Sequence, residues 1–369
     1  MLSKYFEMKS IYLNAAYMGP MPKKARENVE KSVDRAMDPA FLRFADLPAL
    51  TDGLRTRFSS VLDGSAEHIA VSTSVSEIVS HVANGIDFKP GEQVLLLEGD
   101  YPSMVLPWML RAERGDIELK RLPLPVFTDP KKLAAEINKK TRFVGCSHVQ
   151  FNTGRTLPIA EIGRLCRKNG ALFLADVSQS LGGLRLAPEI MSEVDILAGV
   201  AYKWLLGPYG SAFARFSNES LDQIRRTHAA WLASPKSLAA ESLLEYTTET
   251  LPGARRFDRG QAPSFLICAA LDGALETLID AGLDNIQDHN AGLVEEFLEG
   301  LPQGFELAAP RETLANIVCI KPPIEDAMGL KARLARKKID VSVREGFVRL
   351  AFHAFNTHEH VKAVLKEIV

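Results

Sequence analysis

The sequence has few cysteines, no long apolar run and no excess of charge of either sign. Its four cysteines, Cys146, Cys166, Cys268 and Cys319, are far apart, without the paired spacing of zinc or redox sites or the density of a disulfide scaffold. No run reaches the roughly 18 apolar residues that span a membrane, and the N-terminal residues lack the pattern of a signal peptide. We therefore expect a cytoplasmic protein with reduced thiols.

The charges nearly balance, with 44 lysines and arginines against 46 aspartates and glutamates. Such a balance gives no field that gathers nucleic acid or an anionic membrane, so a small molecule is the expected partner. The 369 residues are 46% hydrophobic and 24% charged, which is typical of globular proteins. A chain of this length favours two domains, or one large α/β domain with an appendage.

Short apolar runs alternate with amphipathic stretches from about residue 67, which predicts an α/β fold with a mainly parallel, doubly wound sheet. In such sheets ligands bind at the carboxyl ends of the strands. Seven strands are expected at 68–72, 93–97, 117–122, 142–148, 171–176, 195–200 and 211–216, and helices at 76–84, 104–114, 130–137 and 158–168.

After about residue 265 the pattern predicts a smaller α+β domain, with helices at 267–281, 290–301 and 327–337, a closing helix from 357, and strands at 317–321 and 347–352. The polar stretch 234–259 predicts a connector and a bridging helix. The expected division is an N-terminal segment on the small domain (1–20), a large cofactor-binding domain (21–245), a connector (246–264) and the small domain (265–369).

The common nucleotide and hydrolase signatures are missing. The first strands are not followed by GxGxxG, and neither GxxxxGK[ST] nor GxSxG occurs in the chain. The dinucleotide, P-loop and α/β-hydrolase interpretations therefore have no support.

Two charged residues follow predicted buried strands. Asp176 ends the run ALFLAD. A buried carboxylate there is unfavourable unless it pairs with a cation, such as a protonated pyridine nitrogen. The alternative is that Asp176 caps the following loop. Lys203 follows DILAGVAY and precedes a Gly-Pro turn, so partial desolvation should lower its pKa and make the amine a nucleophile toward an aldehyde. Most lysines at strand ends merely reach solvent, so Lys203 alone would be weak support.

Eight segments in order resemble the fold type I enzymes that use pyridoxal 5'-phosphate (PLP), specifically the class V aminotransferase family of cysteine desulfurases, kynureninases and isopenicillin N epimerase. The resemblance implies PLP held as a Schiff base on Lys203, with Asp176 at the pyridine nitrogen. The segments are YLNAAYMGPMP (12–22), STSVSE (72–77), DYPSMVLPW (100–108), SHVQFNTGRTLPI (147–159), LADVSQSLGGL (174–184), YKWLLGPYG (202–210), RRFDRGQAP (255–263) and VRLAFHAFNT (348–357).

The remaining cofactor contacts follow from the resemblance. The amides of Val75 and Ser76, at a predicted helix N-terminus, should meet the phosphate, and a helix cap is a compatible alternative. Tyr101 should stack on the ring, although core packing is as common for a lone tyrosine. Gln179 should bind the phenolic oxygen, and Asn152 is a further cofactor candidate.

The resemblance also assigns the substrate side. Arg349 matches the α-carboxylate clamp of the family, where a guanidinium makes two hydrogen bonds; a surface ion pair is the alternative. His148, Arg155 and Asn152 should line the substrate side, together with Asn14 and Tyr17 of the N-terminal motif. Phe151 stands where many relatives carry an asparagine.

Other positions depart from the family pattern. Val200 replaces a phosphate-binding serine, and Tyr202, still expected near the cofactor, replaces a histidine. Gly260-Gln261 stands where a Gly-Thr pair reaches the phosphate of the other subunit. The segment 255–263 is therefore expected to cross between subunits of a homodimer. No metal is expected.

The predicted function is a PLP-dependent enzyme that acts on a small amino acid through an external aldimine, with Lys203 moving the proton at Cα. A class V aminotransferase is favoured, while a β-eliminating lyase and an epimerase stay open. Desulfuration is disfavoured because the segment KKIDVSVREG has no cysteine and Cys319 is expected to be buried and inert. A non-catalytic PLP-binding protein would need neither Lys203 nor Arg349.

Overall fold

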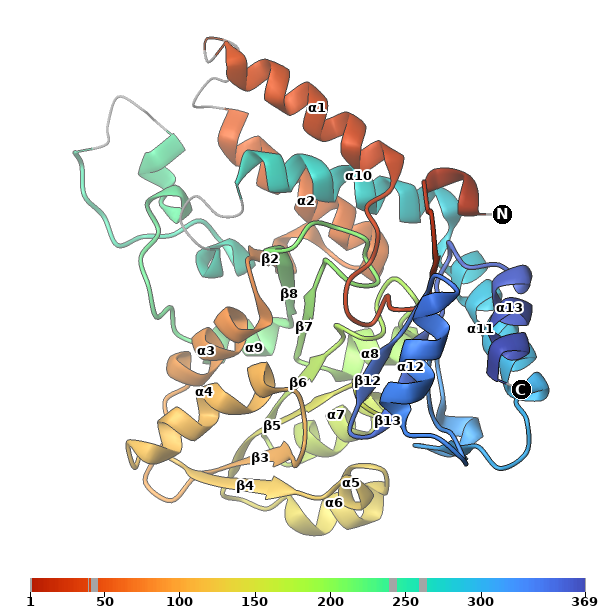
Figure 1. Ribbon diagram of the computed structural model, residues 1–369. Helices are drawn as coiled ribbons and strands as arrows, with labels where there is room; N and C mark the ends of the chain where they lie inside the picture. The colour runs from red at the N-terminus through yellow and green to blue at the C-terminus, as the bar shows by residue number, and fades with distance from the viewer. Residues whose placement is uncertain (1, 39, 41–45, 239–243, 259–263, 369) are drawn as a thin grey trace.

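A seven-stranded sheet forms the centre of the computed structural model, which describes residues 2–38, 40, 46–238, 244–258 and 264–368 (Figure 1). The strand order is β2-β8-β7-β6-β5-β3-β4. Only β8 runs against the other strands, because it pairs antiparallel with both of its neighbours, β2 and β7. The predicted α/β class and all seven predicted strands are confirmed. The strands are β2 (Ile69–Ser72), β3 (Gln93–Leu97), β4 (Glu118–Leu122), β5 (Thr141–Ser147), β6 (Leu172–Asp176), β7 (Ile196–Val200) and β8 (Ala212–Phe216).

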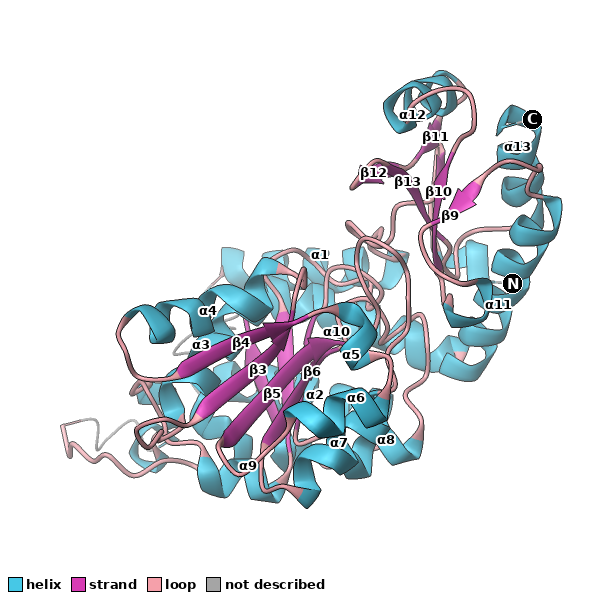
Figure 2. Ribbon diagram, turned by 90° about the horizontal axis from the view of Figure 1, so that it is seen from below, coloured by secondary structure: helices cyan, strands magenta, loops and turns pink. Residues whose placement is uncertain are grey.

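Helices cover both faces of this sheet (Figure 2). Alternate residues of one strand point to opposite faces, so Val94 and Leu96 of β3 join one apolar cluster with α3 and α4. Leu95 and Leu97 join the other cluster, which contains side chains of α2, α7 and α10. The helices around the sheet are α1 (Lys23–Met37), α2 (Asp46–Leu62), α3 (Val75–Gly85), α4 (Pro102–Glu113), α5 (Leu124–Phe127), α6 (Pro130–Glu136), α7 (Ile159–Lys168), α8 (Pro188–Glu193), α9 (Asn218–Gln223) and α10 (Phe265–Ala281).

A second, smaller sheet forms a separate lobe with its own apolar cluster (Figure 2). Its strand order is β12-β13-β10-β9, and the N-terminal strand β1 pairs in parallel with β11 beside it. The elements of this lobe are β1 (Ile11–Tyr12), α11 (Leu283–Gly300), β9 (Glu306–Leu307), β10 (Ile317–Lys321), α12 (Ala327–Arg336), β11 (Ile339–Asp340), β12 (Ser342–Arg344), β13 (Phe347–Ala351) and α13 (His358–Ile368). None of the helices in the described part of the chain is long and apolar enough to cross a membrane.

Two features differ from the sequence prediction. The prediction of a bridging helix within 234–259 is wrong for the described part of that stretch. There, Pro235–Leu238 and Gly253–Phe257 form only short 3-10 turns beside prolines. Helix α10, predicted with the small domain, instead packs on α1 and α2 and contributes to the core under the large sheet (Figure 1). The boundaries drawn between domains stay a prediction.

A pair of helical glycines tests the packing of α10. A Cβ at Gly273 of α10 would lie 2.6 Å from the carbonyl oxygen of Lys24 in α1, whereas a Cβ at Gly292 of α11 would meet nothing within 4 Å. Gly273→Ala should therefore lower the free energy of unfolding by about 1–3 kcal/mol, since two helix backbones must separate.

The matched control, Gly292→Ala, should raise the free energy of unfolding by about 0.5–1 kcal/mol, because alanine has the better helix propensity. Urea unfolding of both variants measures the difference. Equal effects of the two substitutions would contradict the close contact between α1 and α10.

Candidate active site

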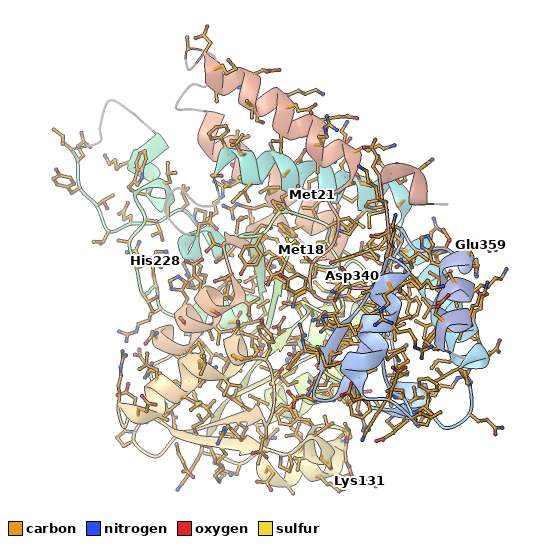
Figure 3. All side chains as sticks on the ribbon, viewed as in Figure 1. Met18, Met21, Lys131, His228, Asp340 and Glu359 are labelled. Atoms are coloured by element: carbon orange, nitrogen blue, oxygen red, sulfur yellow. The ribbon has the colours of Figure 1, made fainter. Side chains whose placement is uncertain are left out.

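Two adjoining cavities lie at the carboxyl ends of β5, β6 and β7, where the doubly wound topology predicts a ligand. The inner cavity, of about 280 Å³, reaches from Asp176 to the N-terminus of α3. The outer cavity, of about 390 Å³, is lined by the N-terminal segment and by the small sheet; Met18, one of its lining residues, lies near the middle of the molecule in Figure 3. The cavities form one cleft because both are lined by Tyr101, Phe151, Gln179, Tyr202, Lys203 and Tyr209.

Asp176 is the last residue of β6 and lines the inner cavity with only 4% of its surface exposed. Its Oδ1 accepts a hydrogen bond of 2.7 Å from the backbone amide of Ser178. Burial raises the pKa of Asp176, although this hydrogen bond and the nearby Lys203 oppose the rise. A carboxylate in such a place is stabilised by a cation that enters the cavity.

Lys203 follows β7 and lines both cavities. Its Nζ lies 5.2 Å from the centre of the Tyr101 ring and 5.9 Å from that of Tyr202. Burial lowers the pKa of Lys203 from 10.5 to about 8, while the carboxylate of Asp176 opposes the shift. The amine is therefore far more often neutral near physiological pH than that of an exposed lysine.

The N-terminal segment holds the Lys203 loop in place. The backbone amide of Gly19 donates a hydrogen bond of 2.8 Å to the carbonyl oxygen of Tyr202. A Cβ at Gly19 would lie 2.1 Å from the carbonyl oxygen of Lys203, so only glycine permits this approach. The motif at 12–22 thus positions the lysine through backbone contacts.

The N-terminus of α3 offers unused hydrogen-bond donors to the inner cavity. Ser74 caps the helix by accepting from the amide of Glu77, and the Glu77 carboxylate accepts from the backbone amide of Thr73. Among the hydrogen bonds between described residues, none uses the amides of Val75 and Ser76. These amides and the helix dipole suit an anionic group.

Tyr101 and Gln179 face both cavities. The Tyr101 ring makes an edge contact with Phe151, with 5.3 Å between the ring centres. Gln179 is fixed at both ends of its amide, since Nε2 donates to the carbonyl oxygen of Ala16 and Oε1 accepts from Nε1 of Trp204. The second hydrogen on Nε2 is left for a ligand.

Asp100 is a structural residue of the site that the sequence analysis missed. Its carboxylate accepts hydrogen bonds from the amide of Tyr101 and from both the amide and the hydroxyl of Ser147 at the end of β5. Burial raises the pKa of Asp100 to about 6. Its place three residues after the buried strand β3 is the signal that could have revealed it.

Arg349 reaches the outer cavity from β13 of the small sheet, with 1% of its surface exposed. Its Nε donates to the Ser342 hydroxyl and its Nη1 to the carbonyl oxygen of Phe151, whereas Nη2 is buried without a partner. Burial lowers the pKa of Arg349 to about 10. The alternative of a surface ion pair is excluded by this burial, and the spare donor suits a ligand carboxylate.

The structure does not bring every candidate residue to the cleft. Tyr17 lines the outer cavity, while Asn14, His148, Asn152 and Arg155 line neither cavity. Two of these residues make other contacts: the side chain of Asn14 donates a hydrogen bond to Asp340, and Arg155 forms a β-bridge with Leu314 of the small lobe. Gly260 and Gln261 lie outside the described residues. The sequence analysis did not assign the lining residues Ala16, Met18, Thr73, Ser74, Ser103, Ser147, Ser178, Tyr209, Gly210 and Arg344.

The cysteines lie away from this chemistry. All four are buried, and none lines either cavity. Cys319 pairs with Arg349 across β10 and β13, and burial raises the pKa of its thiol to about 12. A thiol with that pKa is a poor nucleophile at neutral pH.

The fold and site define a fold type I PLP-dependent enzyme, and the comparisons with known proteins identify the family. Residues 45–364 match the family Aminotransferase class-V. The chain therefore belongs to this family, which is PLP-dependent.

Curated relatives of different activities are similar along most of the chain. Isopenicillin N epimerase of Streptomyces clavuligerus is 28% identical, over 95% of this chain and 92% of that protein. An uncharacterized aminotransferase, YcbU of Bacillus subtilis, is 25% identical over 86% and 83%, and a probable cysteine desulfurase of Methanothermobacter thermautotrophicus is 23% identical over 84% and 80%. The match fixes the family and leaves the reaction open.

Solved structures share the fold. A C-DES mutant with glycine covalently linked to its PLP cofactor superposes with a TM-score of 0.87, at 22% identity, over 98% of this chain and 96% of that chain. The cysteine desulfurase of Thermococcus onnurineus superposes with a TM-score of 0.81, at 20% identity, over 97% and 93%.

The residues of the inner cavity fit PLP. The two unused amides at α3 match a phosphate, the buried carboxylate of Asp176 matches a protonated ring nitrogen, and the amine of Lys203, with its lowered pKa, matches an aldehyde. The residues that provide these three features all line the inner cavity.

The depressed pKa of Lys203 predicts a pH-dependent stability in the cofactor-free protein. Between about pH 8 and 10.5 the unfolded chain binds this proton more tightly than the folded protein does. The buried ammonium therefore costs stability below pH 8, and the cost disappears as the pH rises through this window. Lys203→Met should stabilise the protein by about 3 kcal/mol more at pH 7 than at pH 10.5.

Urea unfolding of wild-type and variant at both pH values measures this difference. Lys131→Met is the control, because Lys131 is exposed at the edge of the large sheet lobe (Figure 3). Its effect should be the same at both pH values. A pH-independent effect of Lys203→Met would show that the amine is not desolvated.

Proposed function

We propose that this protein is a class V aminotransferase that acts on a small amino acid with PLP bound at Lys203. One observation carries the proposal. A buried amine with its pKa lowered to about 8 shares a cavity with a buried carboxylate, beside an arginine that has a spare donor. Each of these buried groups lowers the stability of the folded protein unless a ligand binds to it.

The proposed cofactor contacts use groups that have donors or charges to spare. Lys203 would hold the cofactor covalently, and Asp176 would hold the ring nitrogen. Val75 and Ser76 would hold the phosphate, together with the Ser103 hydroxyl, which lies 2.8 Å from that of Ser76 and would take over part of the role of the serine and threonine that relatives carry. Tyr101, Gln179 and Tyr202 would line the ring, and a role for Asn152, Gly260 or Gln261 stays a prediction.

Bound PLP supplies electron withdrawal that weakens the bonds at Cα of an attached amino acid. Lys203 would then take the proton from Cα as general base, since a pKa of about 8 suits proton transfer near neutral pH. Arg349 would orient the substrate by donating to its α-carboxylate from the unpartnered Nη2. Aromatic side chains around the cleft would exclude water from the reacting atoms.

Epimerisation is the second candidate, because an isopenicillin N epimerase matches 95% of this chain. Inversion requires a proton to reach the face of Cα opposite Lys203. Burial raises the pKa of the nearby Tyr202 to about 12, so this phenol is rarely ionised near neutral pH and is a poor base. This favours a reaction in which Lys203 is the single base. A persulfide-forming desulfurase is disfavoured, as no cysteine lines the cleft.

We further propose a cytoplasmic homodimer in which the segment 255–263 crosses between subunits. Part of this segment, residues 259–263, lies outside the described residues. The resemblance of the segment to the crossing element of the family supports the proposal, and sedimentation analysis of the active holoenzyme tests it. A fully active monomer would refute it.

Removal of the Lys203 amine should abolish the covalent linkage to PLP. Wild-type protein incubated with PLP and reduced with borohydride should carry one pyridoxyl label, located at Lys203 by peptide mass spectrometry. Lys203→Ala should lose the label, and Lys131→Ala should keep it. A label that persists in Lys203→Ala would overturn the assignment.

Product analysis separates the two candidate reactions. With an amino acid and an oxo acid, an aminotransferase should release the oxo acid of the donor, whereas an epimerase should produce the opposite enantiomer with no oxo acid. Ammonia with pyruvate would instead indicate β-elimination. Lys203→Ala should lower any of these rates by at least about a hundredfold, the usual contribution of a general base.

A further inference from the structure

The outer cavity contains a second arginine, Arg344, that comes from the same hairpin as Arg349. Strands β12 and β13 pair antiparallel, with Arg344 opposite Phe347 and Ser342 opposite Arg349. Only Glu345 and Gly346 connect them, with φ values of 47° and 79°. Positive φ at both positions is typical of the type I′ turn, which fixes the register of a hairpin.

This register places both arginines on one face. Residues directly opposite in an antiparallel pair share a face, as do residues two apart in one strand. Arg344 and Arg349 are therefore diagonal neighbours, with Cβ atoms roughly 7 Å apart, and both line the outer cavity. A shift of one residue would turn Arg344 to the other face, so the short turn determines its position.

The outer cavity is strongly cationic. Lys203, Arg344 and Arg349 line it, and no aspartate or glutamate is among its lining residues. The positive charge of Arg344 helps to lower the pKa values of Lys203 and Arg349, although burial is the larger cause in both. The like charges repel one another, and an anionic ligand would relieve this repulsion.

Both guanidinium groups keep donors available for a ligand. Arg349 has the unpartnered Nη2, and the hydrogen bond that Arg344 makes runs from Nη1 to the neighbouring carbonyl oxygen of Val343. No ion pair joins Arg344 to a carboxylate in the described part of the chain. Asp340, on the preceding strand, accepts from Asn14 instead. Each arginine can therefore bind its own anionic group.

We propose that Arg344 determines substrate specificity by binding a carboxylate in the side chain of the amino acid, while Arg349 binds the α-carboxylate. The proposal rests on the proposed function and narrows its substrate class to dicarboxylic amino acids. Three of the tyrosines that line the outer cavity, Tyr17, Tyr202 and Tyr209, offer apolar ring surface for the methylene groups between the two carboxylates.

Titration of the holoenzyme in the absence of an oxo acid tests the inference, because no catalytic cycle can then be completed and the spectral change gives apparent dissociation constants. Dissociation constants would be measured from the change in PLP absorption on titration with L-aspartate and L-glutamate, and with their uncharged isosteres L-asparagine and L-glutamine. Wild-type protein should bind the diacids at least about tenfold more tightly than the amides, as expected of a charged hydrogen-bonded pair.

Arg344→Gln should bring this ratio close to one by weakening diacid binding, with amide binding changed by less than about twofold. Arg344→Lys should retain part of the preference. Arg336→Gln, on the exposed end of α12, removes the same charge from the same lobe outside the cavity and should leave the ratio unchanged.

Three results would overturn the inference. The first is a wild-type protein that does not prefer diacids, and the second is an Arg344→Gln variant that keeps the preference. The third is an equal loss of diacid and amide binding in that variant, which would assign both arginines to the α-carboxylate. A spectrum that no amino acid changes, in protein that does form the Lys203 linkage, would refute the proposed function as well.

Discussion

The site depends on keeping a lysine and an aspartate buried beside one cavity at the ends of parallel strands. Transfer of either charged group out of water is unfavourable, which the lowered pKa of Lys203 and the raised pKa of Asp176 both express. The surrounding chain holds them because β6 and β7 are rigid, fully buried strands. The same desolvation that opposes folding makes the amine nucleophilic and the carboxylate receptive to a cation.

Backbone contacts from distant segments complete the arrangement. The N-terminal segment approaches Lys203 so closely that Gly19 has no room for a side chain, and it pairs with β11 of the small lobe through β1. The Phe151 carbonyl receives a hydrogen bond from Arg349, which connects the loop after β5 to the small sheet. The outer cavity is thus lined by residues of both lobes.

The small sheet contributes the two arginines of the outer cavity. In the hairpin of β12 and β13, Ser342 orients Arg349, and a two-residue turn sets the position of Arg344. The family match leaves the reaction undecided, since relatives of similar identity carry the names of an epimerase, an aminotransferase and a desulfurase. Function therefore has to be argued from the residues of the site, since one fold supports several reactions.

The sequence by itself determined the sheet and the two charged residues at its strand ends. Hydrophobic runs such as 172–176 and 196–200 are local patterns, and a polar residue directly after such a run must lie at the strand end. Only the tertiary structure decided which loop residues reach the cleft. Arg155 forms a β-bridge with the small lobe, while Arg344 lines the outer cavity, because contacts between segments far apart in the chain place these residues. Local sequence patterns do not contain that information.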